Sequence, residues 1–171
     1  MRRRILYVLA LPLMLAGVVT AASVSPALAV SPHFVSAAGT LNSNGTLTVN
    51  FKEAGLGTNQ LINYTLSANA SATYVCVNKG GANPSASNKT NVAGPVSASG
   101  TFNSGKNGNV TASLTVQPPP ANLNCPGGQT QQVASVTYTG VTLTDTTNGI
   151  TVSLGDFSSG CLLPNVRGAC S

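Results

Sequence analysis

The chain of 171 residues has few charged side chains, few aromatic side chains and no tryptophan. Asp, Glu, Lys and Arg make up 6% of the sequence, and Phe, Trp and Tyr make up 5%. Scarce charge argues against a nucleic-acid-binding surface, which needs clustered Lys and Arg. The missing tryptophan removes the aromatic platform that sugar-binding proteins commonly use, and Tyr64, Tyr74 and Tyr138 lie in patterns of buried strands. Sugar contacts would therefore have to come from amides and hydroxyls.

The first 29 residues have the organisation of a signal peptide. MRRR is followed by the apolar stretch 5–19 and by small residues that end in Ala27-Leu28-Ala29. This is the order of a basic region, an apolar region and an A-x-A cleavage site, whereas a membrane span needs about 20 apolar residues. We predict cleavage after Ala29 and secretion of one domain, residues 30–171, to the extracellular space, with no membrane attachment.

Signal cleavage would also change the charge of the protein, because Arg2, Arg3 and Arg4 would be removed. The basic residues that remain, at positions 52, 79, 89, 106 and 167, are scattered singly along the sequence. The surface must then consist largely of Ser, Thr, Asn and Gly. We therefore predict no nucleic-acid partner.

Few side chains are available for catalysis or metal binding. A Ser-His-Asp triad needs a histidine base, but His33 follows the cleavage site closely, where chains often fray. Two carboxylates could cleave a glycosidic bond, but Asp145 and Asp156 occupy turn-like positions that are typical of loop caps. The cysteines include no C-x-x-C pair. We predict no enzyme, no catalytic residue, no metal site and no cofactor.

Short stretches of alternating apolar and polar residues recur along the predicted mature chain. In one of them Leu47, Val49 and Phe51 alternate with Thr and Asn. A period of two is typical of strands with one buried face, and several Asn-Gly pairs precede such stretches, as in hairpin turns.

The alternation predicts an all-β protein with no helix in the mature chain. About eight strands are expected, near 33–41, 46–52, 61–68, 71–78, 92–103, 109–117, 132–144 and 149–155. Many short strands separated by turns indicate an antiparallel β-sandwich of immunoglobulin-like architecture, with a barrel as the alternative.

The segment 132–144 changes the parity of its apolar residues at Gly140. Val136 and Tyr138 are at even positions, whereas Val141 and Leu143 are at odd positions. A β-bulge at Gly140 would keep all four on one face. The threonines between them would then face outward.

Four cysteines remain after the predicted cleavage, and an even number in a small exported chain indicates two disulfides. Three pairings are possible. The short spacing of Cys161 and Cys170 favours a local bond, which leaves Cys76 to pair with Cys125.

The C-terminal segment CLLPNVRGAC, residues 161–170, has the features of a binding loop. A disulfide would close it, and it contains Leu163, Pro164 and an Arg167 that we expect to be exposed. Such a preorganised loop could present Arg167 to a trypsin-like protease as an inhibitor. The other interpretation is a stapled tail that resists exopeptidases.

FKEAGLG, residues 51–57, contains adjacent opposite charges. Phe51 completes an inward-facing set, so Lys52 should point outward before Ala54-Gly55-Leu56-Gly57 turns the chain. We interpret Lys52 and Glu53 as a feature of the sandwich rim, where charge discourages edge-to-edge aggregation. A Lys–Asn isopeptide crosslink is a second hypothesis, but it needs a buried lysine beside an acid, and neighbours on a strand point to opposite faces.

Five segments, FKEAGLG, TYVCVNKGG, GTFNSGKNG, CPGGQ and VTYTGVTLTDTTNG, resemble a group of small secreted β-rich proteins from soil-dwelling microbes. The similarity runs over residues 40–155, most of the predicted mature chain. It implies a secreted single domain with a Cys76–Cys125 pair, and it implies no activity.

Together these observations predict a secreted, non-enzymatic β-sandwich that acts outside the cell as a binding or surface-associated module. We expect a monomer whose partner is an extracellular protein or a cell-wall or polysaccharide ligand. The alternatives are a protease inhibitor that presents the loop 161–170 and a carbohydrate-binding module.

Overall fold

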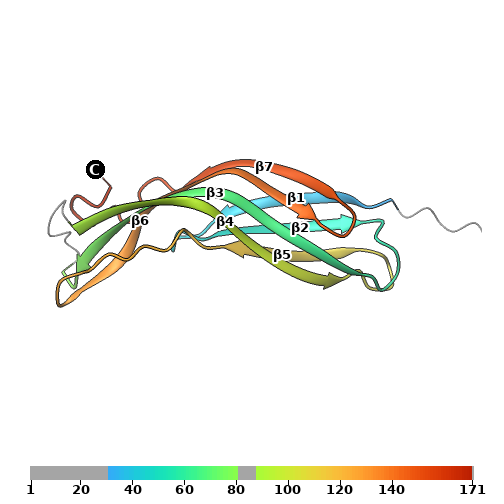
Figure 1. The fold of residues 1–171 in the computed structure, drawn as a ribbon, viewed down its shortest axis with the longest axis horizontal. Coiled ribbons are helices and arrows are strands. Elements are labelled where there is room, and N and C mark those ends of the chain that lie inside the picture. Colours follow the sequence, from blue (N-terminus) through green and yellow to red (C-terminus); the bar gives the residue numbers. More distant parts are fainter. Residues whose placement is uncertain (1–30, 81–87, 171) are drawn as a thin grey trace, which may run out of the picture.

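The computed structural model describes residues 31–80 and 88–170, which form seven strands and no α-helix. The predicted signal peptide, residues 1–29, lies outside these residues, and no helix in the described part is long and apolar enough to cross a membrane. The strands run along the long axis of the molecule (Figure 1). They are β1 (His33–Leu41), β2 (Leu47–Ala54), β3 (Leu61–Asn78), β4 (Lys89–Asn103), β5 (Val110–Val116), β6 (Gln129–Asp145) and β7 (Ile150–Ser158).

The strands form two antiparallel sheets, which confirms the predicted β-sandwich. One sheet has three strands in the order β1-β2-β5, and the other has four in the order β4-β3-β6-β7. In an immunoglobulin constant-type sandwich the fourth strand joins the sheet of the first, second and fifth strands. Here β4 pairs with β3 along its length and widens the second sheet.

The structure has seven strands where the alternation predicts about eight, because the predicted strands 61–68 and 71–78 form the single strand β3. The small residues around Asn69 suggest a break. However, Asn69 and Ala70 pair on one side with β4 and on the other with β6. Ala70 is buried, so β3 keeps its inward-facing set across this point.

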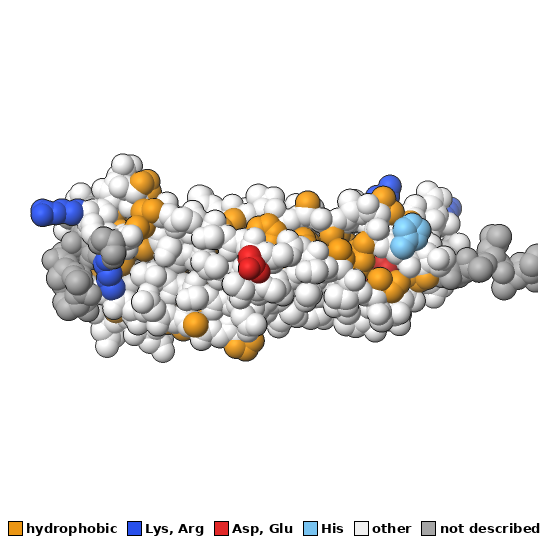
Figure 2. All heavy atoms as spheres, turned by 90° about the horizontal axis from the view of Figure 1, so that it is seen from above, with side chains coloured by type: hydrophobic (Ala, Val, Ile, Leu, Met, Phe, Trp, Pro, Cys, Tyr) orange, Lys and Arg blue, Asp and Glu red, His pale blue; other side chains and the backbone are white. Residues whose placement is uncertain are grey.

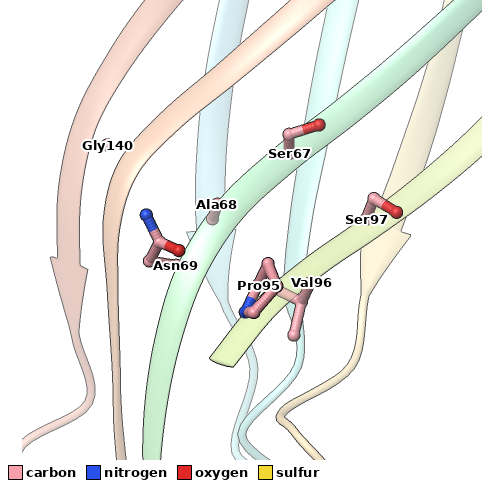
Figure 3. Close-up of a pocket in the computed structure, with 7 residues that line it drawn as sticks. All are labelled: Ser67, Ala68, Asn69, Pro95, Val96, Ser97 and Gly140. Carbon is pink, nitrogen blue, oxygen red and sulfur yellow. The ribbon is translucent and has the colours of Figure 1, made fainter. Parts of the chain in front are cut away.

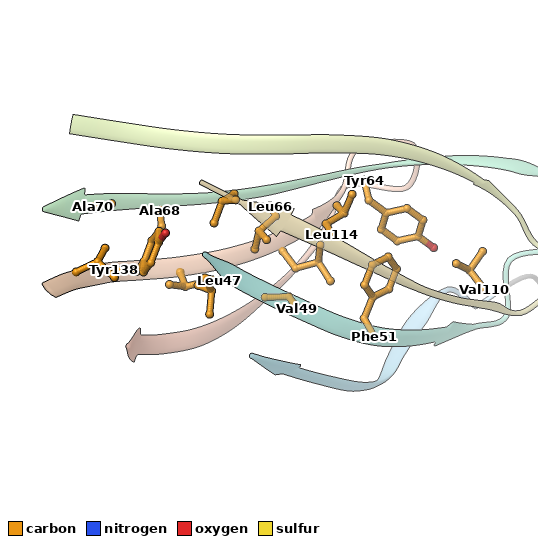
Figure 4. Close-up of a cluster of buried hydrophobic side chains, with 14 of the residues drawn as sticks. Leu47, Val49, Phe51, Tyr64, Leu66, Ala68, Ala70, Val110, Leu114 and Tyr138 are labelled. Carbon is orange, nitrogen blue, oxygen red and sulfur yellow. The ribbon is translucent and has the colours of Figure 1, made fainter. Parts of the chain in front are cut away.

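The core lies between the two sheets, where inward side chains of β2, β3, β5 and β6 meet (Figure 4). The rings of Phe51 and Tyr64, from opposite sheets, have centroids 4.7 Å apart, and Phe34 and Phe102 pack around them. Each fully buried side chain of this size contributes roughly 1.5–3 kcal/mol through removal of apolar surface from water.

Buried tyrosines also link the core to connecting segments. The Tyr138 hydroxyl donates to the Gly45 carbonyl at 2.8 Å, and the Tyr74 hydroxyl donates to the Pro119 carbonyl at 2.8 Å. Tyr64, Tyr74 and Tyr138 are therefore core residues, as the alternation predicts.

The predicted bulge lies at Gly140. Ser67 pairs with Thr142 and Asn69 pairs with Thr139, so two residues of β6 oppose Ala68 alone. Gly140 has a positive φ of 60°, and its N–H donates to Oδ1 of Asp156 at 2.8 Å. The extra residue restores the inward direction of the side chains that follow it.

Two disulfides close the chain, in the pairing that the cysteine spacing favours. Cys76 at the end of β3 is bonded to Cys125 in the connection between β5 and β6, 49 positions away. Cys161 is bonded to Cys170, nine positions away. These bonds fit an extracellular protein.

Gly39 of β1 provides a close contact between the sheets. A Cβ atom there would lie 2.4 Å from Cζ of Phe157 in β7. We predict that Gly39→Ala destabilises the protein by about 1–3 kcal/mol, because the Phe157 ring must move. The matched control is Gly94→Ala in β4, where no atom of the described residues lies within 4 Å of the added Cβ. Urea unfolding should show the loss for Gly39→Ala only, and equal effects of the two substitutions would contradict this packing.

Candidate functional site

The outer face of the four-stranded sheet is an extended surface of small polar side chains. On β3 the outward positions from Asn63 to Thr73 are Asn, Thr or Ser, and on β6 threonines face outward on both sides of the bulge. The sandwich thus presents neutral hydroxyl and amide groups to solvent. Figure 2 views the molecule from the side of β7 and β1, where the basic side chains lie toward the two ends and one acidic side chain and several apolar patches lie between them.

Many polar side chains on this face bond to one another across strands. Thr65 pairs with Ser99 at 3.0 Å, Thr144 with Thr151 at 2.9 Å, and Thr101 donates to Asn63 at 2.6 Å. These contacts hold the side chains in fixed rotamers and use part of their hydrogen-bonding capacity.

One row across the sheet is different. It consists of one hydroxyl residue from each strand, and each pairs in register with the residue on the neighbouring strand. In spatial order these residues are Ser97 of β4, Ser67 of β3, Thr142 of β6 and Ser153 of β7. Among the described residues, none of these four side chains forms a hydrogen bond, unlike the paired hydroxyls in the row beside it. Strand spacing gives the row a span of roughly 14–15 Å. We call these residues the hydroxyl row.

A shallow hollow of about 480 Å³ lies beside the hydroxyl row (Figure 3). Ser67, Asn69, Ser97 and Pro95 line it, together with Gly140. Gly140 has no side chain to fill the space, and Pro95 has no N–H to donate to a further strand at the sheet edge. The bulge at Gly140 therefore shapes a surface as well as correcting the register of the core.

A different polar cluster lies inside the sandwich. The side chain of Glu53 continues the inward set of Leu47, Val49 and Phe51 and has no exposed surface. The rim interpretation is therefore wrong for Glu53, although Lys52 does point outward into solvent and Leu56 is tucked into the core. An exposed Lys52 also lacks the buried setting that an isopeptide crosslink requires.

The buried carboxyl group of Glu53 forms no hydrogen bond with the described residues. Tyr64 and Asp145, from the facing sheet, are the polar neighbours of its carboxyl group, but neither Glu53 oxygen nor the Tyr64 hydroxyl has a partner in hydrogen-bonding geometry among the described residues. Burial raises the pKa of Glu53 to about 7; Asp145 also raises it, whereas Tyr64 and His33 lower it. Burial and the nearby Glu53 likewise raise the pKa of Tyr64.

Asp145 is buried, but its carboxylate is well satisfied. Its Oδ1 accepts hydrogen bonds from the N–H groups of Thr147 and Asn148, and its Oδ2 accepts one from Nδ2 of Asn148 at 2.6 Å. It caps the β6–β7 turn, as its position in the sequence predicts. Asp156 is exposed and caps the bulge instead, so the three acidic residues do not gather in one cleft.

His33 is exposed on β1, at the edge of the three-stranded sheet. Its Nδ1 lies 2.8 Å from the carbonyl oxygen of Ser31. Within residues 31–80 and 88–170, no three His, Cys, Asp or Glu side chains come together as a metal site.

Comparison of the chain with protein-family models, with curated proteins and with solved structures finds no match in any of the three. The resemblance of five segments to small secreted microbial proteins therefore stays a prediction.

The C-terminal loop 161–170 packs onto the sheet. Leu163 and Val166 contact a second buried cluster that includes Val75 and Val77, on the face of β3 that points away from the main core. Consecutive turns, closed by hydrogen bonds from Val166 to Leu163 and from Ala169 to Val166, give it a folded path.

Only part of the loop is available to a partner. Pro164 and Arg167 are exposed, whereas Leu163 is half-buried. A substrate-like inhibitor presents an extended segment to the protease. The geometry thus favours a structural role for the loop, which covers Val75 and Val77, and protease inhibition stays a hypothesis.

Proposed function

We propose that the protein is a secreted, non-enzymatic module that binds a neutral polysaccharide outside the cell, through the outer face of the four-stranded sheet. The observation that carries the proposal is the hydroxyl row beside the hollow at Gly140. These side chains lie on strands and form no hydrogen bond within residues 31–80 and 88–170, so a ligand can use their full hydrogen-bonding capacity.

The chemistry of this face suits an uncharged glycan. Sugar hydroxyls donate and accept hydrogen bonds, and so do Ser, Thr and Asn side chains. The four side chains of the hydroxyl row are uncharged, so contact with them avoids the cost of desolvating an ion. The exposed carboxylate of Asp156, which accepts the Gly140 N–H, lies next to the hollow rather than in the row. The row crosses four strands and fits the length of a short oligosaccharide segment.

The test is sedimentation with insoluble cellulose, chitin and the producer's purified cell wall, at 50 and 500 mM sodium chloride. We expect binding to a neutral polymer that is insensitive to salt, because hydrogen bonds rather than exposed charges would hold the glycan. Binding only to charged polymers, binding lost at high salt, or no binding to any polymer would overturn the proposal.

A paired set of variants locates the binding surface. We predict that Ser67→Ala with Thr142→Val weakens binding about tenfold, since two hydrogen bonds of about 0.5–1.5 kcal/mol each are lost. The control, Ser113→Ala with Thr111→Val, removes the same groups from exposed positions on β5 of the other sheet. Equal affinities for the two double variants, measured by depletion isotherms, would place the site elsewhere.

A further inference from the structure

We call the end of the sandwich that carries the connections 55–60 and 104–109 the loop end. A carboxyl group buried there, that of Glu53, has no hydrogen-bond partner among the described residues. Glu53 comes from β2, in register with Phe34 of β1 and Val110 of β5, and it faces Tyr64 and Asp145 on the other sheet. Native proteins rarely leave buried polar atoms without partners, and such atoms call for a physical account.

The charged and titratable groups around Glu53 are few. Tyr64 on β3, Asp145 on β6 and His33 on β1 are those that act on its carboxyl, whereas Lys52 points away on the opposite face of β2 and the β5 partner is apolar. His33 has only a minor effect, and it is exposed. Two carboxyl groups therefore lie in an apolar interior, and the part of the chain that the structure describes places no buried cation beside them.

Asp145 has one acceptor site left for a proton donor. A carboxylate oxygen can accept two hydrogen bonds. Oδ1 of Asp145 accepts two from the backbone of the β6–β7 turn, but Oδ2 accepts only one, from the Asn148 amide. A protonated Glu53 could donate its O–H to this oxygen and so join the two sheets.

We propose that Glu53 and Asp145 form a pH-dependent latch that holds the loop end of the sandwich closed while Glu53 is protonated and releases it when the proton is lost. Ionised Glu53 would face a second carboxylate in an apolar interior, which is costly. The relief is for the end of β2 to move outward and bring Glu53 to water.

The latch would control surfaces that are closed in this structure. The connection 55–60 is held to the connection 104–109 by hydrogen bonds from the N–H of Leu56 to Gly108 and from the N–H of Asn59 to Gly105. Leu56 of the first connection belongs to the same buried cluster as the aromatic rings of Phe51 and Tyr64, against which Phe102 packs. Release would loosen these bonds and expose aromatic surface, whereas the disulfide end at Cys76 would stay closed.

The sequence makes the latch easy to observe, because Glu53 is the sole glutamate in the chain. Selective ¹³C labelling of glutamate therefore gives one carboxyl signal. We expect its chemical shift to change with an inflection close to neutral pH, and Tyr64→Phe should move the inflection to higher pH because the hydroxyl favours the ionised form. Asp156→Asn, which changes an exposed carboxylate, should leave it in place.

Amide hydrogen exchange tests the release itself. Between pH 5.5 and 8.5 the protection factor of the Leu56 amide, corrected for the intrinsic exchange rate, should fall at least about tenfold in the wild-type protein. It should stay constant in Glu53→Gln, and protection of Val75 should not change. An inflection near pH 4.5, no inflection between pH 4 and 9, or the same loss of protection in Glu53→Gln would overturn the proposal.

Discussion

Replacement of Cys76 and Cys125 by alanine is expected to lower the free energy of unfolding by about 4 kcal/mol. The bond closes a loop with a sequence separation of 49, and the loss of chain entropy in the unfolded state grows with the logarithm of loop length. It also anchors the long connection from β5 to β6 to the end of β3, at the edge of the second buried cluster. Urea unfolding of the wild-type protein and the double variant measures the difference.

The second disulfide provides the comparison for this prediction. Cys161 and Cys170 close a separation of only nine residues, so their double alanine variant should lose about 3 kcal/mol by the same reasoning. The order of the two losses is the informative quantity. A larger loss at Cys161–Cys170 would show that covering Val75 and Val77 matters more than loop closure.

The stability of the folded protein should fall as the pH rises from about 5 to above 7, by an amount on the order of 3 kcal/mol. Burial raises the pKa of Glu53 from 4.5 to about 7. Between these values the folded protein keeps a proton that the unfolded chain has released, so each step to higher pH favours unfolding. The stabilisation by the protonated Glu53 is fully present below pH 4.5 and is lost as the pH passes through 7. The size of the expected change in the free energy of unfolding follows from about 1.4 kcal/mol per pKa unit.

Glu53→Gln isolates this effect. Glutamine has the shape of a protonated glutamic acid and does not ionise, so the variant should match the wild-type protein at pH 5 and exceed it at pH 8.5. Denaturation by urea at the two pH values measures both changes. A wild-type stability that rises with pH, or a variant with the same pH dependence as the wild-type protein, would contradict the assignment to Glu53.

The strands could be predicted from the sequence because one face of each sheet is buried. Apolar residues therefore alternate with polar residues along each strand. The same rule gives the bulge at Gly140, since apolar residues change parity there and only an extra residue can keep Tyr138 and Val141 on one side. The same alternation indicates that Glu53 points inward, because it has the parity of Leu47 and Phe51. The rim interpretation gave the charge of Glu53 more weight than this parity.

Other features depend on pairing between distant strands. Nothing local to Ser97, Ser67, Thr142 and Ser153 indicates that they form one row, because their alignment is set by three separate strand registers. The meeting of Glu53 with Asp145 likewise depends on how the two sheets stack. The predicted strands 61–68 and 71–78 form the single strand β3 because Asn69 and Ala70 pair with β4 on one side and with β6 on the other.

The most direct test of the proposed binding face is a ¹⁵N NMR titration with a soluble oligosaccharide of the neutral polymer that sediments the protein. The account predicts that amide shifts concentrate at Ser67, Ser97 and Thr142, with smaller changes around Gly140. Shifts confined to Thr111 and Ser113 on the other sheet, shifts in the loop 161–170, or no shifts at millimolar sugar would contradict it.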